Sequence, residues 1–228
     1  MRKFNTQGIV LARTNYGEAA RIITFLTPEH GKLKVMAKGV RKSKSKLAGG
    51  IELFSVSDIG VMAGRGEVDT LVSSRLNKHY GNIVKDLGRT NLAYQFIKNL
   101  DKATAEQPES AYFDLLESAF QSLDDISVSI ELLEAWFGAQ LLKLSGHAPN
   151  LRTNKSGSKL TSDQKYDFDF DSMSFEPGRT YDAGQIKFLR LLFSANQPAK
   201  LQKVQGAANL AQKSQRLIWP ILQAQIGL

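Results

Sequence analysis

A series of short apolar runs separated by turn residues fills the first eighty residues, and it constrains the fold more than any other feature. The runs lie at 8–14, 22–26, 33–37, 53–61 and 68–76. Each has the length of a β-strand and is shorter than an ordinary helix. Five short strands within so few residues predict a small β-barrel, and we expect residues 1–80 to form this domain.

Two of the segments between these runs contain the residues of tight turns. Residues 27–31 read Thr-Pro-Glu-His-Gly, and residues 63–67 read Ala-Gly-Arg-Gly-Glu. Proline presets φ for an early position of a turn, and glycine accepts the left-handed backbone of a late one. Both segments are therefore predicted to connect neighbouring strands.

One of the predicted strands has a core face and a cationic face, because side chains alternate between the two faces of a sheet. Between residues 32 and 38, one face carries Leu33, Val35 and Ala37. The opposite face carries Lys32, Lys34, Met36 and Lys38. We expect the first set to be buried and the lysines to be exposed.

Beyond residue 81 the apolar spacing becomes helical. From Val128 to Leu144 apolar residues recur at steps of three and four, the period of a helix with one apolar face. Gly146 and Pro149 end this helix. Two earlier helices are predicted at 83–101 and 108–123, so residues 81–149 should form a helical bundle.

The segment 150–180 is a small insertion, poor in helix-forming residues and rich in Asn, Ser, Gly and Asp. The alternating stretch Tyr166–Asp171 predicts one strand of a hairpin. Helices resume near Asp182 and complete the bundle over 181–228, with Pro198 and Pro220 as interruptions. The expected fold class is α+β, with a β-barrel first and helices after it.

The positive charge is concentrated in the predicted barrel. The whole chain has a net charge of +8, and residues 1–80 hold 14 Lys and Arg against 6 Asp and Glu, which leaves 16 against 16 for the rest. A local positive field attracts polyanions and speeds their encounter. Nucleic acid is the favoured partner, and an anionic membrane surface is the second.

The barrel charge culminates in seven cations within fifteen residues, with no acid among them: Lys32, Lys34, Lys38, Arg41, Lys42, Lys44 and Lys46. A solvated surface usually interleaves Glu and Asp with its lysines. Clustered cations on one accessible surface are what phosphate binding requires. We predict a nucleic-acid site here, extended by Arg65 in the second turn. Aromatic rings beside such cations can stack on bases, and Tyr16, Phe25, Phe54 and Tyr80 are the candidates.

The chain lacks the sequence motifs of most common enzyme classes. There is no cysteine, which excludes disulfides, thiolate zinc sites and a cysteine nucleophile, and the three histidines lie far apart. The sequence has no P-loop, dinucleotide-binding loop, H-E-x-x-H motif or G-x-S-x-G elbow. We expect a non-enzymatic protein without a metal or cofactor.

One cluster keeps an alternative open. Asp167, Asp169 and Asp171 share a face of their predicted strand, and three carboxylates could surround a divalent cation in a metal-dependent nuclease. The favoured interpretation is an edge strand protected by its charges. An RNA-binding barrel protein, or an adaptor whose basic face only adds solubility, are further alternatives.

Nothing in the sequence indicates a membrane protein. No run of about 18 apolar residues could span a bilayer, and the first residues, Met1–Phe4, lack the apolar region of a secretory signal. The expected location is the cytoplasm.

Several segments together resemble the bacterial RecO family of recombination mediators. In the first half these are 8–11, 15–18, 21–22, 27–32, 37–41, 45–47, Phe54 and 64–68, and a later one is 144–151. The resemblance implies an N-terminal OB-fold, a helical bundle and an inserted zinc-ribbon-like piece. Many members have Cys-x-x-Cys-Gly where this chain has Thr153–Gly157, so the insertion is expected to be a degenerate ribbon without metal.

The resemblance also implies a function. It implies a nucleoid-associated protein that binds single- and double-stranded DNA and anneals complementary strands. With RecR, it would help load RecA onto strands coated by single-stranded-DNA-binding protein (SSB). Family members hold the acidic, Phe-terminated SSB tail in a helical region, for which Trp136, Phe137 and Leu141 with Lys143 are candidates. The same aromatic stripe is also typical of a bundle core.

Overall fold

The structure, a computed structural model, describes residues 2–104 and 110–227. The chain divides into two compact units, residues 1–124 and 125–228. Unit 1 contains the strands of a barrel and two helices, and unit 2 contains three helices and a small sheet. Each unit is described by itself.

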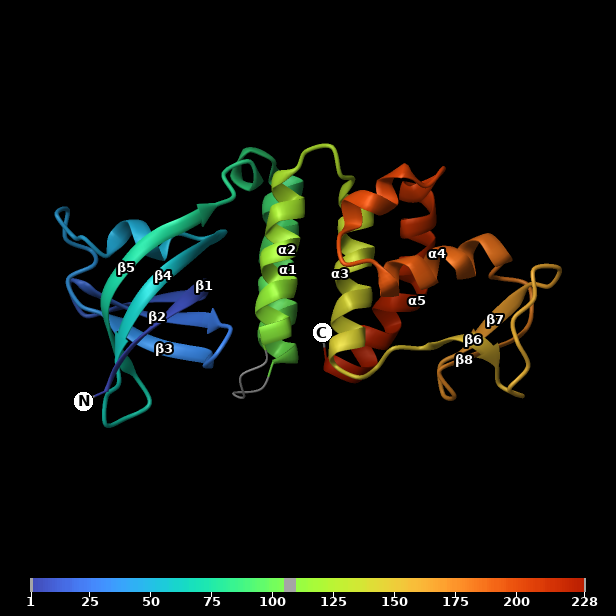
Figure 1. The fold of residues 1–228 in the computed structure, drawn as a ribbon, viewed down its shortest axis with the longest axis horizontal. Coiled ribbons are helices and arrows are strands. Elements are labelled where there is room, and N and C mark those ends of the chain that lie inside the picture. Colours follow the sequence, from blue (N-terminus) through green and yellow to red (C-terminus); the bar gives the residue numbers. More distant parts are fainter. Residues whose placement is uncertain (1, 105–109, 228) are drawn as a thin grey trace. The chain divides into compact units, whose positions relative to one another are not determined.

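The barrel of unit 1 has five strands: β1 (Lys3–Tyr16), β2 (Ala20–Thr27), β3 (Gly31–Ala37), β4 (Ser55–Met62) and β5 (Asp69–His79). They form a closed barrel in the order β1-β2-β3-β5-β4 (Figure 1). All pairs are antiparallel except β3 with β5. A closed five-stranded barrel confirms the predicted fold class and fits the OB-fold that the resemblance implies.

The first strand closes the barrel because it has two partners. Its first half pairs with β4 from Lys3 to Ile9, and its second half pairs with β2 from Ile9 to Tyr16. A bulge between Val10 and Ala12 lies just beyond the change of partner. Bulges bend a strand and increase its twist, which is how a long strand turns the corner of a small barrel.

The barrel core is built from the inward residues of these strands, among them Val10, Ile23, Phe25, Val35 and Ile59. On β3, Val35 and Ala37 are buried while Lys34 and the following Lys38 are exposed, as the alternation predicts. Leu33 is partly buried and packs against the same core. The strand therefore presents cations to solvent because its apolar face is used inside.

The turn between β2 and β3 has the predicted geometry. Gly31 has a φ of 59°, the left-handed region that favours glycine. The hydroxyl of Thr27 donates to the carbonyl of Gly31 at 2.9 Å and accepts from the backbone N–H of His30 at 3.1 Å. One buried side chain thus closes the turn.

A short 3-10 helix, η1 (Ala48–Ile51), lies between β3 and β4 in the sequence. In the structure it packs against β5. The hydroxyl of Ser74 on β5 donates to the carbonyl of Leu47 at 2.9 Å. Gly50 approaches Ser74 so closely that a Cβ on Gly50 would lie 2.4 Å from the Cβ of Ser74. Only glycine allows this contact.

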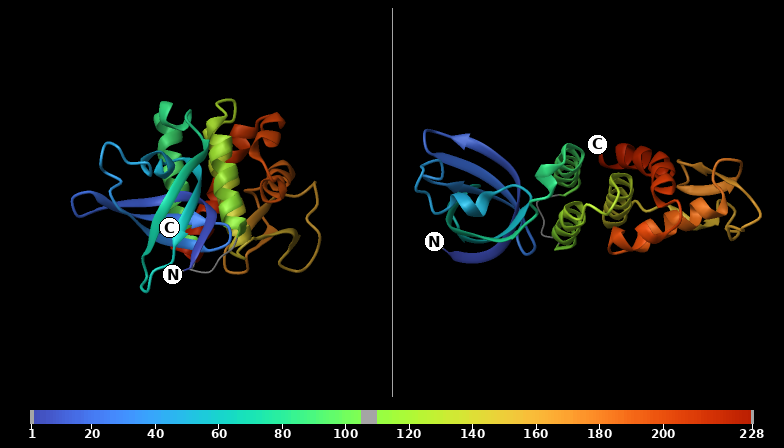
Figure 2. Two further views of the ribbon diagram at one scale, coloured as in Figure 1. Left: turned by 60° about the vertical axis from the view of Figure 1, so that its left-hand side comes forward. Right: turned by 90° about the horizontal axis from the view of Figure 1, so that it is seen from above.

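After the barrel come η2 (Ile83–Lys85), α1 (Leu87–Ala103) and α2 (Ser110–Asp124). The helix predicted from residue 83 begins at 87, because Asp86 caps it by accepting from the N–H of Arg89 at 2.8 Å. Residues 108–109, where the next helix was expected to begin, lie outside the described residues. Figure 2 shows α1 and α2 side by side, and each buries an apolar face.

Unit 2 consists of α3 (Ile130–Leu144), β6 (Asn150–Asn154), β7 (Tyr166–Asp169), β8 (Ser174–Pro177), α4 (Ala183–Ser194), η3 (Pro198–Lys203) and α5 (Ala207–Ile226). The helix α3 packs against α4 and α5. Its Trp136 donates from Nε1 to the carbonyl of Ala195 at 2.8 Å, and Trp219 of α5 donates to Glu134 at 3.2 Å. Both indoles thereby satisfy their polar atom at the edge of an apolar core.

The prediction that Pro220 interrupts the last helix was wrong. The helix α5 runs through Pro220, whose side chain is exposed, while Leu217, Ile218, Ile221 and Leu222 around it are buried. A proline removes one backbone hydrogen bond. The apolar residues on the buried face offset that loss and keep the chain helical.

We predict that Gly50→Ala destabilises the barrel by about 1–3 kcal/mol, since the added methyl group overpacks the contact with Ser74. The measurement is the free energy of unfolding from urea titrations followed by circular dichroism. The matched control is Gly49→Ala, where a Cβ would meet nothing within 4 Å and the change should stay within about 0.5 kcal/mol. Equal stabilities of the two variants would contradict the close approach.

Candidate nucleic-acid interface

The predicted cationic cluster continues from β3 into the loop formed by residues 38–46, here called the cationic loop. Val40 is 5% exposed and belongs to the barrel core, and Leu47, directly after the loop, packs against the same core. The side chains between these anchors are exposed: Lys38, Arg41, Lys42, Lys44 and Lys46. The loop therefore presents its charges from a fixed base.

Arg41 ties the cationic loop to the turn between β1 and β2. Its backbone N–H donates to the carbonyl of Ala19 at 3.1 Å, and its guanidinium donates from Nη1 to the carbonyl of Gly17 at 3.1 Å. Arg41 is therefore a positioning residue as well as a cation. The contact brings the loop to the corner of the barrel where β1 ends at Tyr16.

Of the four rings considered for stacking, Tyr16 is accessible. Its side chain is 57% exposed, whereas Phe25, Phe54 and Tyr80 are buried. Tyr80 also lies beside Glu117, and burial together with this carboxylate raises the pKa of the Tyr80 hydroxyl. A ring can stack on a base only where solvent reaches it. Of these four rings, Tyr16 therefore stays the candidate for base stacking.

Lys32 differs from the other cations because it is already paired. Its ammonium contacts the Oδ1 of Asp101 on α1 at 2.8 Å and also donates to the backbone carbonyl of Asp101. Only 20% of the Lys32 side chain is exposed. Its charge is thus partly neutralised within unit 1, while Lys34, two residues on, is exposed.

A groove runs across the outer face of the first three strands, here called the β1–β3 groove. It encloses about 580 Å³ and is lined, among the described residues, by Ala12, Thr24, Lys32, Lys34, Glu67 and Asp101. The strand register aligns Ala12 with Thr24, and Thr24 with Lys34. Because the side chains of Ala12 and Thr24 are small and lie in one row, the surface between their neighbours is depressed. In OB-folds this face, between the β1–β2 and β4–β5 loops, is where oligonucleotides bind.

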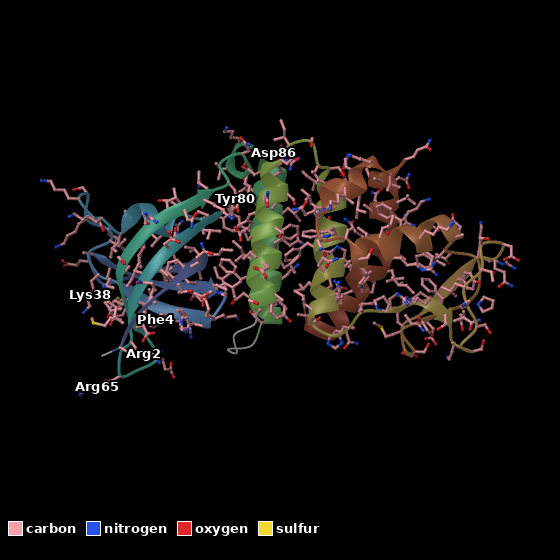
Figure 3. The ribbon with its side chains drawn as sticks, viewed as in Figure 1. Arg2, Phe4, Lys38, Arg65, Tyr80 and Asp86 are labelled. Atoms are coloured by element: carbon pink, nitrogen blue, oxygen red, sulfur yellow. The ribbon has the colours of Figure 1, made fainter. Side chains whose placement is uncertain are left out.

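Arg65 lies at the tip of the loop between β4 and β5, which closes when the N–H of Gly64 donates to Asp69 at 2.8 Å. Figure 3 shows Arg65 and Lys38 at separate places on the barrel. Arg2 lies at the same end of the barrel as Arg65 (Figure 3), and its carbonyl accepts from the N–H of Ala63 at 2.9 Å. The cationic surface thus has two parts.

Arg2 and Lys3 are neighbours of Arg65 that the sequence pattern did not reveal. Both are exposed, and Lys3 pairs with Met62 at the end of β4. The available signal was a pair of cations at the start of a β-run, whose partner strand could not be identified from the sequence. Pairing with β4 is what places them beside the 63–68 loop.

The four residues suggested for a tail-binding slot lie on α3. Trp136 and Phe137 are 1% exposed and Leu141 is fully buried, whereas Lys143 is exposed. A peptide can contact only surface that it can reach, so these exposures weigh against a slot and fit the bundle core that was the other interpretation. The slot stays a prediction.

Comparison with known proteins decides the family. The model of the N-terminal part of recombination protein O matches residues 1–80, and the model of its C-terminal part matches residues 85–228. The chain belongs to the RecO family. The two matches cover both halves of the sequence, including the part after residue 151, which lies beyond the segments that carry the resemblance.

Individual relatives of this RecO family member are named "DNA repair protein RecO". One from Dehalococcoides mccartyi strain 195 is 35% identical over 150 residues, which are 65% of this chain and 58% of the relative. One from Listeria innocua is 29% identical over 198 residues, 82% of this chain and 76% of the relative. One from Trichodesmium erythraeum is 30% identical over 194 residues, 80% and 65%. The chain spans 58% of the length of the Dehalococcoides mccartyi relatives that it matches.

Asp167, Asp169 and Asp171 do not form the row of carboxylates that the sequence predicted. The strand β7 ends at Asp169, because the Oδ1 of Asp169 accepts from the N–H of Asp171 at 3.0 Å and turns the chain. Asp171 therefore lies in a turn. Within residues 2–104 and 110–227, no cluster of three or more His, Cys, Asp or Glu could hold a metal ion.

Side-chain oxygens organise two turns of the small sheet in unit 2. The Oδ1 of Asn154 accepts from the N–H groups of Ser156 at 3.1 Å and Ser158 at 2.8 Å. The Oδ1 of Asp167 accepts from the N–H groups of Arg179 at 3.1 Å and Thr180 at 2.9 Å. Packed rings fill the centre: Tyr166, Phe168, Phe175 and Tyr181. Hydrogen bonds and aromatic packing thus stabilise these turns.

Asp169 is held ionised by its surroundings. Lys155 donates to its Oδ2 at 2.7 Å and Ser172 donates at 2.8 Å, and these hydrogen bonds lower the pKa of the Asp169 carboxyl. The same pair raises the pKa of Lys155.

The described part of the chain has no helix that meets the length and hydropathy needed to cross a bilayer.

We predict that Asp169→Asn weakens the acid dependence of unit 2. Since the folded pKa of Asp169 lies below its unfolded value of about 3.9, its stabilising contribution is present above pH 4 and is lost as the pH falls below that value. The midpoint of urea unfolding between pH 6 and pH 3 should therefore fall less steeply in the variant. Fluorescence of Trp136 and Trp219 reports on this unit. Asp171→Asn is the control, and equal slopes in wild type and Asp169→Asn would contradict the assignment.

Proposed function

We propose that this chain is a non-enzymatic DNA-binding protein of recombination and repair, which grips the phosphate backbone of single- and double-stranded DNA with the cationic loop of its barrel. The supporting observation is the loop itself. Its five cations are exposed, no acid lies between them, and Arg41 fastens the loop to the barrel through Gly17 and Ala19. Membership of the RecO family supports the role in repair.

The mechanism is electrostatic. Each phosphate neutralised by Lys or Arg releases a condensed counterion, which favours binding without any dependence on sequence. When two strands are bound at once, neutralisation lowers their mutual repulsion and lets complementary bases meet. Annealing of complementary strands follows from this, and no covalent bond is made or broken.

The proposed partners are the SSB tail, RecR and, through them, RecA. The support is family membership, and the neutral charge balance of the chain after residue 80 favours a surface for proteins over a further surface for DNA. An acidic tail ending in Phe requires an apolar slot with a cation at its mouth. The burial of Trp136, Phe137 and Leu141 indicates that such a slot should be sought elsewhere on the surface.

We expect the triple variant Lys42→Ala, Lys44→Ala, Lys46→Ala to bind DNA more weakly and with less salt dependence. The plot of log K against log salt should lose about 0.7 to 0.9 in slope for each phosphate contact removed, or roughly 2 to 3 in total. Fluorescence anisotropy with a labelled oligonucleotide measures both quantities. Annealing of complementary strands, with and without SSB, should slow in parallel.

The matched control removes three exposed lysines of unit 2, Lys159, Lys165 and Lys200. It should leave the slope close to the wild-type value. A triple loop variant with an unchanged slope would overturn the proposed site. A matched RNA that binds more tightly than the DNA would instead favour an RNA-binding barrel.

Tyr16→Ala should reduce affinity for a single strand by roughly 5- to 150-fold, the range for loss of one base stacked on an aromatic ring. Tyr16→Phe keeps the ring and should retain the affinity. Duplex DNA, whose bases are already stacked, should bind both variants alike. Equal binding of a single strand by the Ala and Phe variants would show that Tyr16, although exposed, does not contact bases.

A further inference from the structure

The β1–β3 groove has a lining that suits a different part of DNA than the cationic loop does. Along its floor lie Ala12 and Thr24, and Lys34 continues their row. Lys32 and Asp101 contribute one ammonium and one carboxylate, and Glu67 contributes a second carboxylate. Two cations and two anions make the lining neutral, in contrast to the acid-free loop a few residues further along β3.

A phosphate is a poor occupant of this groove. Both carboxylates would repel it, and the ammonium of Lys32 is already bonded to Asp101. An uncharged planar group with both donors and acceptors matches the lining better, because ammonium groups donate and carboxylates accept. The volume of about 580 Å³ lies within the range of small-ligand sites.

We propose that the β1–β3 groove holds an unpaired base of the bound strand, and that its carboxylates select bases with an exocyclic amino group, cytosine above thymine. The proposal rests on the proposed function, since the base belongs to the strand whose phosphates lie on the cationic loop. Carboxylates accept from the N4 amino group of cytosine, and thymine has a carbonyl oxygen at that place. Glu67 is the specificity-determining residue, because the carboxylate of Asp101 is already paired with Lys32. Lys34 donates to the ring acceptors.

The arrangement of β3 makes both contacts possible for one strand. Lys34 belongs to the groove, and Lys38, the first residue of the cationic loop, follows at the end of the same β-strand. Four residues of extended chain separate them, about 13 Å. In a duplex the bases are paired and stacked inside the helix, so a base cannot enter the groove. The groove therefore acts on single strands, while the loop binds either form.

The test compares 20-nucleotide oligo-dC and oligo-dT at pH 8 by fluorescence anisotropy with the full chain. Wild type should bind oligo-dC at least about fivefold more tightly, the lower end of the discrimination that one base contact provides. Glu67→Gln should bring the ratio close to one. Glu18→Gln is the matched control, because it removes an exposed carboxylate on the β1–β2 turn, outside the groove, and should preserve the ratio.

The outcomes separate the two proposals. Equal affinities of wild type for the two oligonucleotides, or an unchanged ratio in Glu67→Gln, would overturn the base-binding groove and leave the cationic loop in place. Failure of wild type to bind either strand at moderate salt would overturn DNA binding itself. The thermal unfolding temperature of Glu67→Gln is compared with that of wild type. Equal temperatures verify that this exposed substitution leaves the barrel folded.

Discussion

The pairing of β1 with two different strands is the constraint on which the barrel and its surface depend. Because β1 runs along β4 and then along β2, the sheet closes and every strand gains an inside and an outside. The inside takes the apolar residues of β3. The outside must then carry Lys34, and the chain continues into the cationic loop. Closure of the barrel thus turns an alternating sequence into a charged surface.

Charge on this surface is divided into parts with different uses. In the cationic loop no acid opposes the lysines, so the loop presents a field suited to phosphate. In the β1–β3 groove two carboxylates accompany two cations, so the groove is suited to uncharged donors and acceptors. Arg41 links the cationic loop to the corner at Tyr16 by hydrogen bonds to backbone carbonyls. A single count of positive charge over the domain does not reveal this division.

The small sheet of unit 2 holds its turns with side-chain hydrogen bonds and packed rings. Asn154 and Asp167 each accept two backbone N–H groups, and aromatic rings occupy the space between the strands. These interactions are individually modest, worth about 0.5–1.5 kcal/mol for a typical hydrogen bond. Asp169 with Lys155 adds a charged pair that depends on pH. The carboxylates that suggested a cation site therefore serve as acceptors for their own chain.

The sequence by itself determined the barrel, the order of the elements and the cationic loop, because these depend on local patterns: alternation on β3, turn residues at 27–31, and helical spacing after residue 81. It misjudged Pro220 and Asp171, where packing in one case and a side-chain hydrogen bond in the other overrode the local pattern. Only the tertiary structure decided that Lys32 is paired with Asp101, 69 residues away, and that Phe25 is buried while Tyr16 is exposed. The physical reason is that a groove or an ion pair depends on which distant segments meet, and the folding of strands and helices against one another, not local spacing, brings those segments together.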